Sequence, residues 1–169
     1  MSPTLQTPDE YRDQGVAKVA ELIADTRVCM LTTTDATGTL VSRPMAVLEV
    51  EFDGDLWFFS DADTRKVEQV RHDGRVDVAF ASGHSWVSVA GQAEVVRDVD
   101  KTEQLWSAVL SSWFPDGPQS PGLVLVKVHA ASAEYWDTPG IGVASVLSFV
   151  KSRATGQRYS GGDNQTVDL

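Results

Sequence analysis

The amino-acid sequence predicts an α+β fold in which a closed or split antiparallel β-barrel carries inserted helices. Three observations favour this class over a doubly wound parallel sheet. Six or seven short segments have the composition of strands, turn residues join most of them as hairpins, and amphipathic helical stretches separate the rest. The 169 residues are 42% hydrophobic, which suffices for one well-packed core but not for two. We therefore predict a single domain over residues 1–169.

The first predicted element is a helix over about residues 7–25. Thr7 and Pro8 provide a cap and a first-turn proline. Apolar residues then recur on one face at helical spacing: Val16, Val19, Ala20, Ile23 and Ala24. A strand over residues 27–34, rich in β-branched side chains, follows and ends in a polar turn at residues 35–38.

A long strand is predicted next, over residues 39–52, because apolar and acidic residues alternate in its second half. Pro44 lies inside this segment and has no backbone N–H to donate, so we expect an edge strand or a bulge there. A hairpin turn at residues 53–55 then returns the chain as a strand over residues 56–60.

The second half of the chain alternates helices and strands in the same way. A short helix over residues 64–72 directs Val67 and Val70 inward, and an amphipathic helix over residues 100–113 ends before Pro115. The predicted strands cover residues 75–81, 86–96, 123–129 and 133–136. A C-terminal tail over about residues 139–169 is predicted to hold one helix, roughly residues 142–153, before a polar end rich in glycine.

Composition excludes several classes of partner. The formal net charge of −10 argues against nucleic acid, because such binding depends on Lys and Arg neutralising phosphates. No secretory signal is visible, and the longest apolar stretch, near residues 141–150, is too short to span a bilayer. The single cysteine, Cys29, alternates with apolar residues in a strand and is predicted to be a buried thiol. We expect a cytoplasmic protein without membrane or nucleic-acid partners.

Neither a metal site nor a catalytic triad is predicted. The three histidines, His72, His84 and His129, are far apart in the sequence and lack the spacing of metal ligands, so we expect them on the surface or in loops.

The segment from Trp57 to Lys66 carries the clearest functional signal. An apolar run ends in Ser60, a tight polar turn follows, and Thr64, Arg65 and Lys66 stand at the head of a helix. Free N–H groups and the positive dipole end of a helix favour an anion, hydroxyls donate short hydrogen bonds, and the two cations supply charge. The pattern predicts a phosphate site. Asp61 and Asp63 within the turn are expected to face solvent, with Asp63 helping to cap the helix.

Arg43 is the second unusual cation, because it lies in the middle of a strand between apolar neighbours. Two interpretations stay open. Arg43 is either an arginine in water at a sheet edge or a cation that reaches the ligand from the strand opposite the phosphate loop.

Phe-Ser-x-x-x-Thr-Arg-Lys after an Arg-Pro-Met strand resembles the flavin-binding signature of the pyridoxamine 5′-phosphate oxidase-like split barrels, and the chain is most similar to their general stress protein 26 group. The resemblance continues at residues 113–115, 133–137 and 161–164. It implies a six-stranded antiparallel split β-barrel that binds FMN, with two flavins at the interface of a homodimer.

The resemblance also implies roles for individual residues. Arg65 and Lys66 would contact the phosphate, while Phe59 and Ser60 would lie beneath the ribityl chain. The segment from Arg43 to Leu48, including Pro44, Met45 and Ala46, would run along the edge of the isoalloxazine ring. Four tryptophans are expected to pack in the core or at an interface: Trp86, Trp106, Trp113 and Trp136. Alternatively, Trp113 and Phe114 cover the flavin of the opposite subunit.

The chain departs from the true oxidases of this superfamily at two places. They carry a lysine where this chain has Leu48, and an Arg-x-His segment that nothing after Trp136 matches. Pyridoxamine phosphate oxidation is therefore not expected. The resemblance favours an FMN-dependent oxidoreductase of unknown substrate, without an assigned catalytic residue. The alternatives are a non-catalytic flavin carrier or sensor, and a reductase that uses the deazaflavin F420, whose polyanionic tail would want a wider basic groove.

Overall fold

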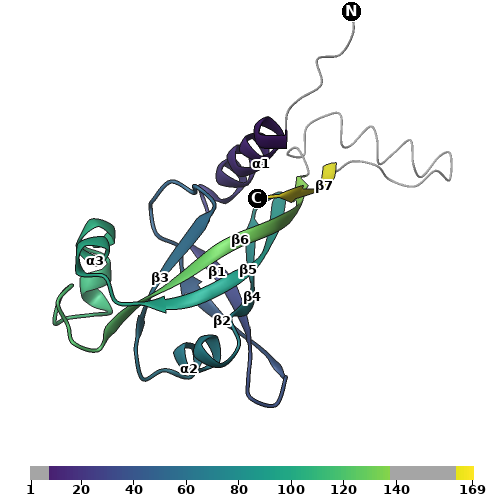
Figure 1. Ribbon diagram of the computed structural model, residues 1–169. Coiled ribbons are helices and arrows are strands. Elements are labelled where there is room, and N and C mark those ends of the chain that lie inside the picture. Colours follow the sequence, from purple (N-terminus) through teal and green to yellow (C-terminus); the bar gives the residue numbers. More distant parts are fainter. Residues whose placement is uncertain (1–7, 138–162) are drawn as a thin grey trace, which may run out of the picture.

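The computed structural model describes residues 8–137 and 163–169 of the chain (Figure 1). In chain order its elements are α1 (Pro8–Ile23), β1 (Val28–Thr34), β2 (Leu40–Ala46), β3 (Asp55–Asp61), α2 (Arg65–His72), β4 (Arg75–Ser82), β5 (Ser85–Val96), α3 (Val99–Leu105), the 3-10 turn η1 (Leu110–Ser112), β6 (Leu123–Asp137) and β7 (Asp163–Asp168). Helix α1 and most of the strands were predicted within a few residues of these bounds.

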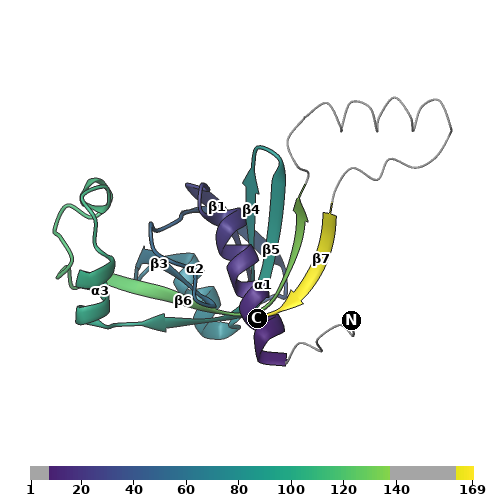
Figure 2. The same cartoon turned by 90° about the horizontal axis from the view of Figure 1, so that it is seen from above.

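The strands form one antiparallel sheet in the order β2-β1-β4-β5-β6-β3, with β7 beside the C-terminal half of β6 (Figure 2). No backbone ladder joins the end strands β2 and β3 within the described residues. The sheet nevertheless curls, which is evident from the fact that residues 44–46 of β2 and 59–61 of β3 line the same pocket. The fold is a split antiparallel barrel with inserted helices, as predicted, and β7 adds a strand to the expected six.

The core fills the inside of this curled sheet, toward which alternate residues of each strand point. Leu31, Val78 and Val126 are fully buried there. Helices α1 and α2 lie at opposite ends of the sheet (Figure 1), and each contributes apolar side chains to the same core cluster. The inward placement of Val67 and Val70 on α2 is confirmed.

The prediction of one long strand over residues 39–52 is wrong beyond Ala46. Ala46 pairs with Val28, where β1 begins, so residues after Ala46 have no neighbouring strand on that side. Strand β3 pairs with β6 rather than returning along residues 39–52. Alternation alone therefore did not suffice for a strand. Pro44 lies on an edge strand, as expected, since β2 pairs with β1 alone in the described sheet.

The predicted helix over residues 100–113 is shorter in the structure. Helix α3 begins after Asp98, whose side chain accepts a hydrogen bond from the Lys101 N–H at 2.9 Å, and it ends at Leu105 because Trp106 adopts an extended conformation. This break lets Trp106 and Phe114 both pack against Phe59 of β3. Trp113, which follows η1, is 73% exposed.

Two predictions about the C-terminal part need correction. The strands expected at residues 123–129 and 133–136 form one continuous strand, β6, which accommodates a bulge opposite Ala90 and Gly91. The polar end of the tail forms β7, and Val167 is buried in the core. The helix expected at residues 142–153 lies outside the described residues.

Candidate functional site

A pocket of about 370 Å³ lies where the ends of β2 and β3 approach α2 and η1. Most of the residues singled out in the sequence line it: Pro44, Met45, Ala46, Phe59, Ser60, Lys66 and Trp113. Its lining also contains Val28, Leu48, Asp61, Leu110 and Phe114. Segments far apart in the sequence therefore meet at one hollow, which has the volume of a small-molecule site.

The turn between β3 and α2 is held by its own hydroxyl groups. The buried Ser60 Oγ lies 3.0 Å from Thr64 Oγ1, and Thr64 Oγ1 donates to the carbonyl oxygen of Asp61 at 2.9 Å. Thr64 occupies the N-cap position of α2, yet its side chain makes no capping hydrogen bond. The first N–H groups of α2 are thus left without a side-chain partner at the cap.

The prediction that Asp63 helps to cap α2 is wrong, because Thr64 is the N-cap residue and no side chain caps the helix. Asp61 and Asp63 are both exposed, as expected. Asp61 nevertheless lies at the edge of the pocket.

Three cations gather beside this turn. Burial lowers the pKa of the Lys66 ammonium, the charge of Arg43 lowers it further, and Asp61 opposes the effect. Burial and the charge of Arg65 likewise lower the pKa of Arg43. None of the three makes an ion pair with another residue of the described chain. The mutual repulsion of these cations, which helps to lower the pKa values of Lys66 and Arg43, would be relieved by an anionic ligand.

Arg43 does not line the pocket, and it is not an arginine in water. Its Nη1 donates to the carbonyl oxygen of Leu31 at 3.1 Å, and its Nη2 donates to Gln69 Oε1 at 2.9 Å. The same Gln69 oxygen accepts a hydrogen bond from Thr33 Oγ1 at 2.7 Å. Arg43 therefore ties β2 to β1 and α2, next to the pocket. Arg65 faces a different hollow, between α2 and the turn that joins β1 to β2.

Gln69 is the residue that the sequence analysis missed. It is 6% exposed and lies on the apolar face of α2 with Val67 and Val70. A polar side chain on an apolar helix face needs a buried partner, and this signal could have identified it.

Replacing Gln69 by leucine should destabilise the protein by ~1–3 kcal/mol, because Arg43 and Thr33 would both lose a buried acceptor. Chemical denaturation measures the free energy of unfolding. Gln104→Leu, at an exposed position of α3, is the matched control and should change stability little. Equal stability of the two variants would contradict the importance of this network.

Aromatic side chains form one wall of the pocket. Phe59 packs edge-on against Trp106, with ring centroids 5.7 Å apart and planes at 88°, and Phe114 lies 6.2 Å from Phe59. The exposed Trp113 stands beside them at the pocket. The hollow thus joins an apolar wall to a cationic corner, an arrangement suited to a flat ring that carries an anionic chain.

The remaining nucleophilic and metal-ligating side chains have structural explanations. Cys29 is buried, as predicted, and burial raises the pKa of its thiol to about 12, so it is not a thiolate at neutral pH. All three histidines are exposed, as expected. His129 on β6 lies 2.7 Å from the Asp55 carboxylate. In the described segments no group of three or more His, Cys, Asp or Glu side chains is placed to hold a metal ion.

Within the described residues, no helix has the length and apolar character needed to cross a bilayer.

Comparisons of the sequence and of the fold with known proteins agree with each other. The sequence profile of the family described as "Pyridoxamine 5′-phosphate oxidase like" matches residues 14–160. Protein bli-3 of Neurospora crassa is 29% identical over 135 residues, which cover 73% of this chain and 65% of that protein's length.

Two crystal structures show the similarity of fold. A structure from Jannaschia sp. CCS1, assigned as a general stress protein 26, has a TM-score of 0.74 at 24% identity and covers 93% of this chain and 99% of that chain. The general stress FMN/FAD binding protein of Xanthomonas citri has a TM-score of 0.67 at 24% identity and covers 78% of this chain and 94% of that chain.

Proposed function

Because this chain belongs to the pyridoxamine 5′-phosphate oxidase-like family, we propose that its pocket between β2, β3 and α2 binds FMN. The observation that carries the proposal is the group of three cations, Arg43, Arg65 and Lys66, none of which makes an ion pair with another described residue. The likeness to a general stress protein that binds FMN or FAD supports it. We propose further that the protein is an FMN-dependent oxidoreductase of the general stress type.

The phosphate belongs at the start of α2 in this proposal. Lys66 lines the pocket there, and Arg65 lies next to it at the free N-terminus of the helix. A dianion would raise the lowered pKa of Lys66 toward its ordinary value. Ser60 and Thr64, whose hydroxyls already touch each other, would complete the corner.

The isoalloxazine ring belongs along residues 44–46 of β2, with Phe59 beneath the ribityl chain. Backbone groups of this edge strand are free on one side, since β2 pairs only with β1 in the described sheet. When bound, the flavin supplies the transfer of hydride or electrons. The residues of the chain bind and orient it, while the hydrogen bonds of Arg43 to Leu31 and Gln69 keep β2 in place beside it.

A second copy of the chain is the proposed cover of the ring. Exposed apolar side chains lie along the outer face of the sheet: Val28, Met30, Trp86 and Trp136. Trp86 and Trp136 are paired across β5 and β6, and Val28 also lines the pocket. The apolar face is therefore continuous with the flavin site, and an exposed face of this kind marks an interaction surface. Trp113, at the pocket, would contact the flavin of the partner subunit.

Two other functions use the same pocket. A flavin carrier or sensor would bind FMN without turnover, which suits a site in which no acid or base is assigned. The deazaflavin F420 would need cations for a longer anionic tail, and the lining of this pocket contains only Lys66 as a cation.

The visible spectrum of the purified protein should show bound flavin, and mass analysis of the material released on denaturation should identify FMN. Stopped-flow mixing with NADH or NADPH then measures reduction of the flavin. Reduction fast enough for turnover supports the oxidoreductase, whereas slow reduction favours the carrier. A protein that is colourless and fails to bind added FMN would overturn the assignment.

A further inference from the structure

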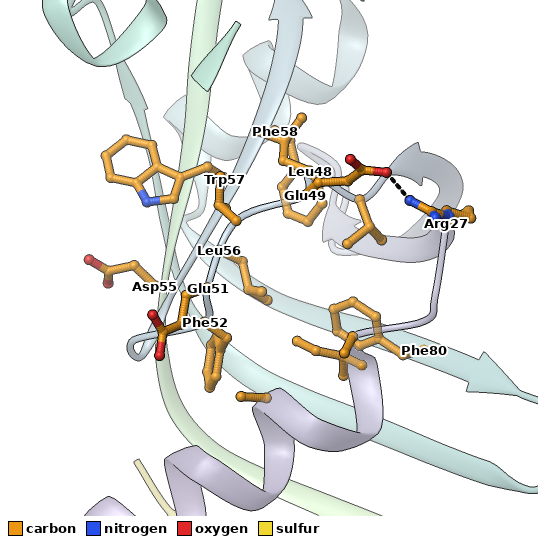
Figure 3. A pocket seen from close by; sticks show the side chains of 15 residues that line it. Arg27, Leu48, Glu49, Glu51, Phe52, Asp55, Leu56, Trp57, Phe58 and Phe80 are labelled. Carbon is orange, nitrogen blue, oxygen red and sulfur yellow. Dashed lines mark hydrogen bonds and ion pairs between the residues drawn. The ribbon is translucent and has the colours of Figure 1, made fainter. Parts of the chain in front are cut away.

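A second and larger pocket, of about 450 Å³, lies between the end of α1 and β3 (Figure 3). The residues that line it come from five parts of the chain: Ala20, Ile23, Ala24, Arg27, Val47 to Phe52, Asp55 to Phe58, and Phe80. Leu48 lines both this pocket and the proposed flavin site, so the two hollows are neighbours.

The walls of the second pocket are apolar and rigid. Phe52, Phe58 and Phe80 are nearly fully buried, and with Leu56 they belong to the main core cluster. Figure 3 shows Phe52, Leu56 and Phe80 around the hollow, below the Arg27–Glu49 ion pair, and Phe58 at the top of the view. Such walls are pre-formed, because moving them would disturb the core.

The charged residues of the pocket lie at its edge and are mostly acidic. Glu49 pairs with Arg27, and Asp55 is within 3.1 Å of Lys127 and 2.7 Å of His129. Glu51 makes no ion pair or hydrogen bond with the residues that the structure describes. Figure 3 places the Glu51 and Asp55 carboxylates together on the edge opposite Arg27. Among the carboxylates of the pocket, Glu51 is therefore the one with which an incoming cation could pair.

We propose that the second pocket binds a small molecule with an apolar ring system and a cationic amine. The rings would lie between Phe52, Leu56 and Phe80, and the ammonium group would pair with Glu51. The volume is within the range of small-molecule sites. The proposal does not depend on flavin, because none of the three cations of the flavin site lines this pocket.

Calorimetric titration of the full, flavin-free protein tests the proposal with matched probes. We expect (1-naphthyl)methylammonium to bind, and 1-naphthoate, which has the same rings and the opposite charge, to bind at least tenfold more weakly. Repeating the titration with FMN-saturated protein separates the two proposals. If the protein failed to bind FMN, binding of the cationic probe to the flavin-free protein would still support the proposal for the second pocket.

Variants at Ala20 of α1 and at Ala24, directly after this helix, locate the site. Ala20→Phe and Ala24→Phe place a ring in the lining and should weaken binding of the cationic probe at least tenfold. Ala24 is exposed, so the second variant keeps the test valid if the first fails to fold. Ala17→Phe, an exposed position of α1 outside the lining, should leave binding unchanged.

Glu51→Gln should reduce the preference for the cationic probe over the uncharged 1-naphthalenemethanol, while Glu21→Gln, outside the pocket, should not. Equal binding of the cationic and anionic probes, or binding that both alanine-to-phenylalanine variants leave intact, would overturn the proposal. The proposal would also be overturned if the wild-type protein were a homodimer that does not bind the probe and the two alanine-to-phenylalanine variants were monomers. A second copy of the chain would then occupy the pocket.

Discussion

Replacing Arg65 and Lys66 together by alanine should weaken FMN binding by at least ~3 kcal/mol, which is a loss of affinity on the order of 100-fold. Lys66, which lines the pocket, and Arg65, whose side chain would turn toward the phosphate from the neighbouring hollow, would each lose one charge-assisted contact, worth about 1.5–3 kcal/mol. Titration of flavin-free protein with FMN, followed by quenching of flavin fluorescence, measures the effect. Wild-type affinity in this double variant would exclude the start of α2 as the phosphate site.

The same variant offers an internal check on folding. Burial and the charge of Arg43 lower the pKa of Lys66, so its charge opposes folding when no anion is bound. Removing it should leave the flavin-free protein at least as stable as the wild type, which thermal unfolding can establish. Arg12→Ala with Arg97→Ala removes two exposed cations outside the pocket and should leave FMN affinity nearly unchanged. An equal loss of affinity in this control would mean that net charge, rather than a site, governs binding.

Replacing Gly91 by alanine should destabilise the protein by ~2 kcal/mol or more. Gly91 lies at the bulge between β5 and β6, where a Cβ atom would stand 2.2 Å from the carbonyl oxygen of His129. That atom belongs to the backbone of the neighbouring strand, so the two strands would have to separate. Chemical denaturation of the variant measures the loss, and a reduced yield of folded protein would agree with it.

Gly122→Ala is the matched control for this substitution. A Cβ atom at Gly122 would come no closer than 3.9 Å to Asp61 Oδ1, which is an ordinary contact. We expect stability within about 0.5 kcal/mol of wild type, as for other substitutions that cause no clash. If Gly91→Ala were tolerated equally well, the close approach of β5 to β6 at the bulge would not be a constraint on the sequence.

What the sequence predicted well depends on local interactions. The turn from Ser60 to Lys66 can be recognised because its hydroxyl groups, the start of the helix and the two cations are neighbours in the chain. The structure places Thr64 at the N-cap of this helix. The inward face of α2 follows from helical spacing in the same way. The strand path could be anticipated from hairpin turns and β-branched residues, and the fold class followed from it.

What the sequence did not predict depends on partners that are distant in the chain. Residues 47–52 alternate like a strand, yet β1 is too short to pair with them. Strand β7 is polar and lacks alternation, but β6 is long enough to pair with it. Gln69 acquires its importance only when Arg43 and Thr33 arrive from other strands. In each case tertiary context, rather than intrinsic propensity, decided the outcome.

The absence of a ladder between β2 and β3 in the described sheet has a consequence for how such a barrel can evolve by substitution. Paired strands are held about 4.8 Å apart by their hydrogen bonds, so the distance between them is fixed. The pocket at the seam between β2 and β3 is lined by side chains of the two strands, by Leu48 of the connection between them, by Lys66 of α2 and by residues in and after η1. Substitutions there can widen or narrow the opening without breaking a single backbone hydrogen bond. The seam is therefore the part of the scaffold where a new ligand shape can be accommodated with the least loss of folding stability.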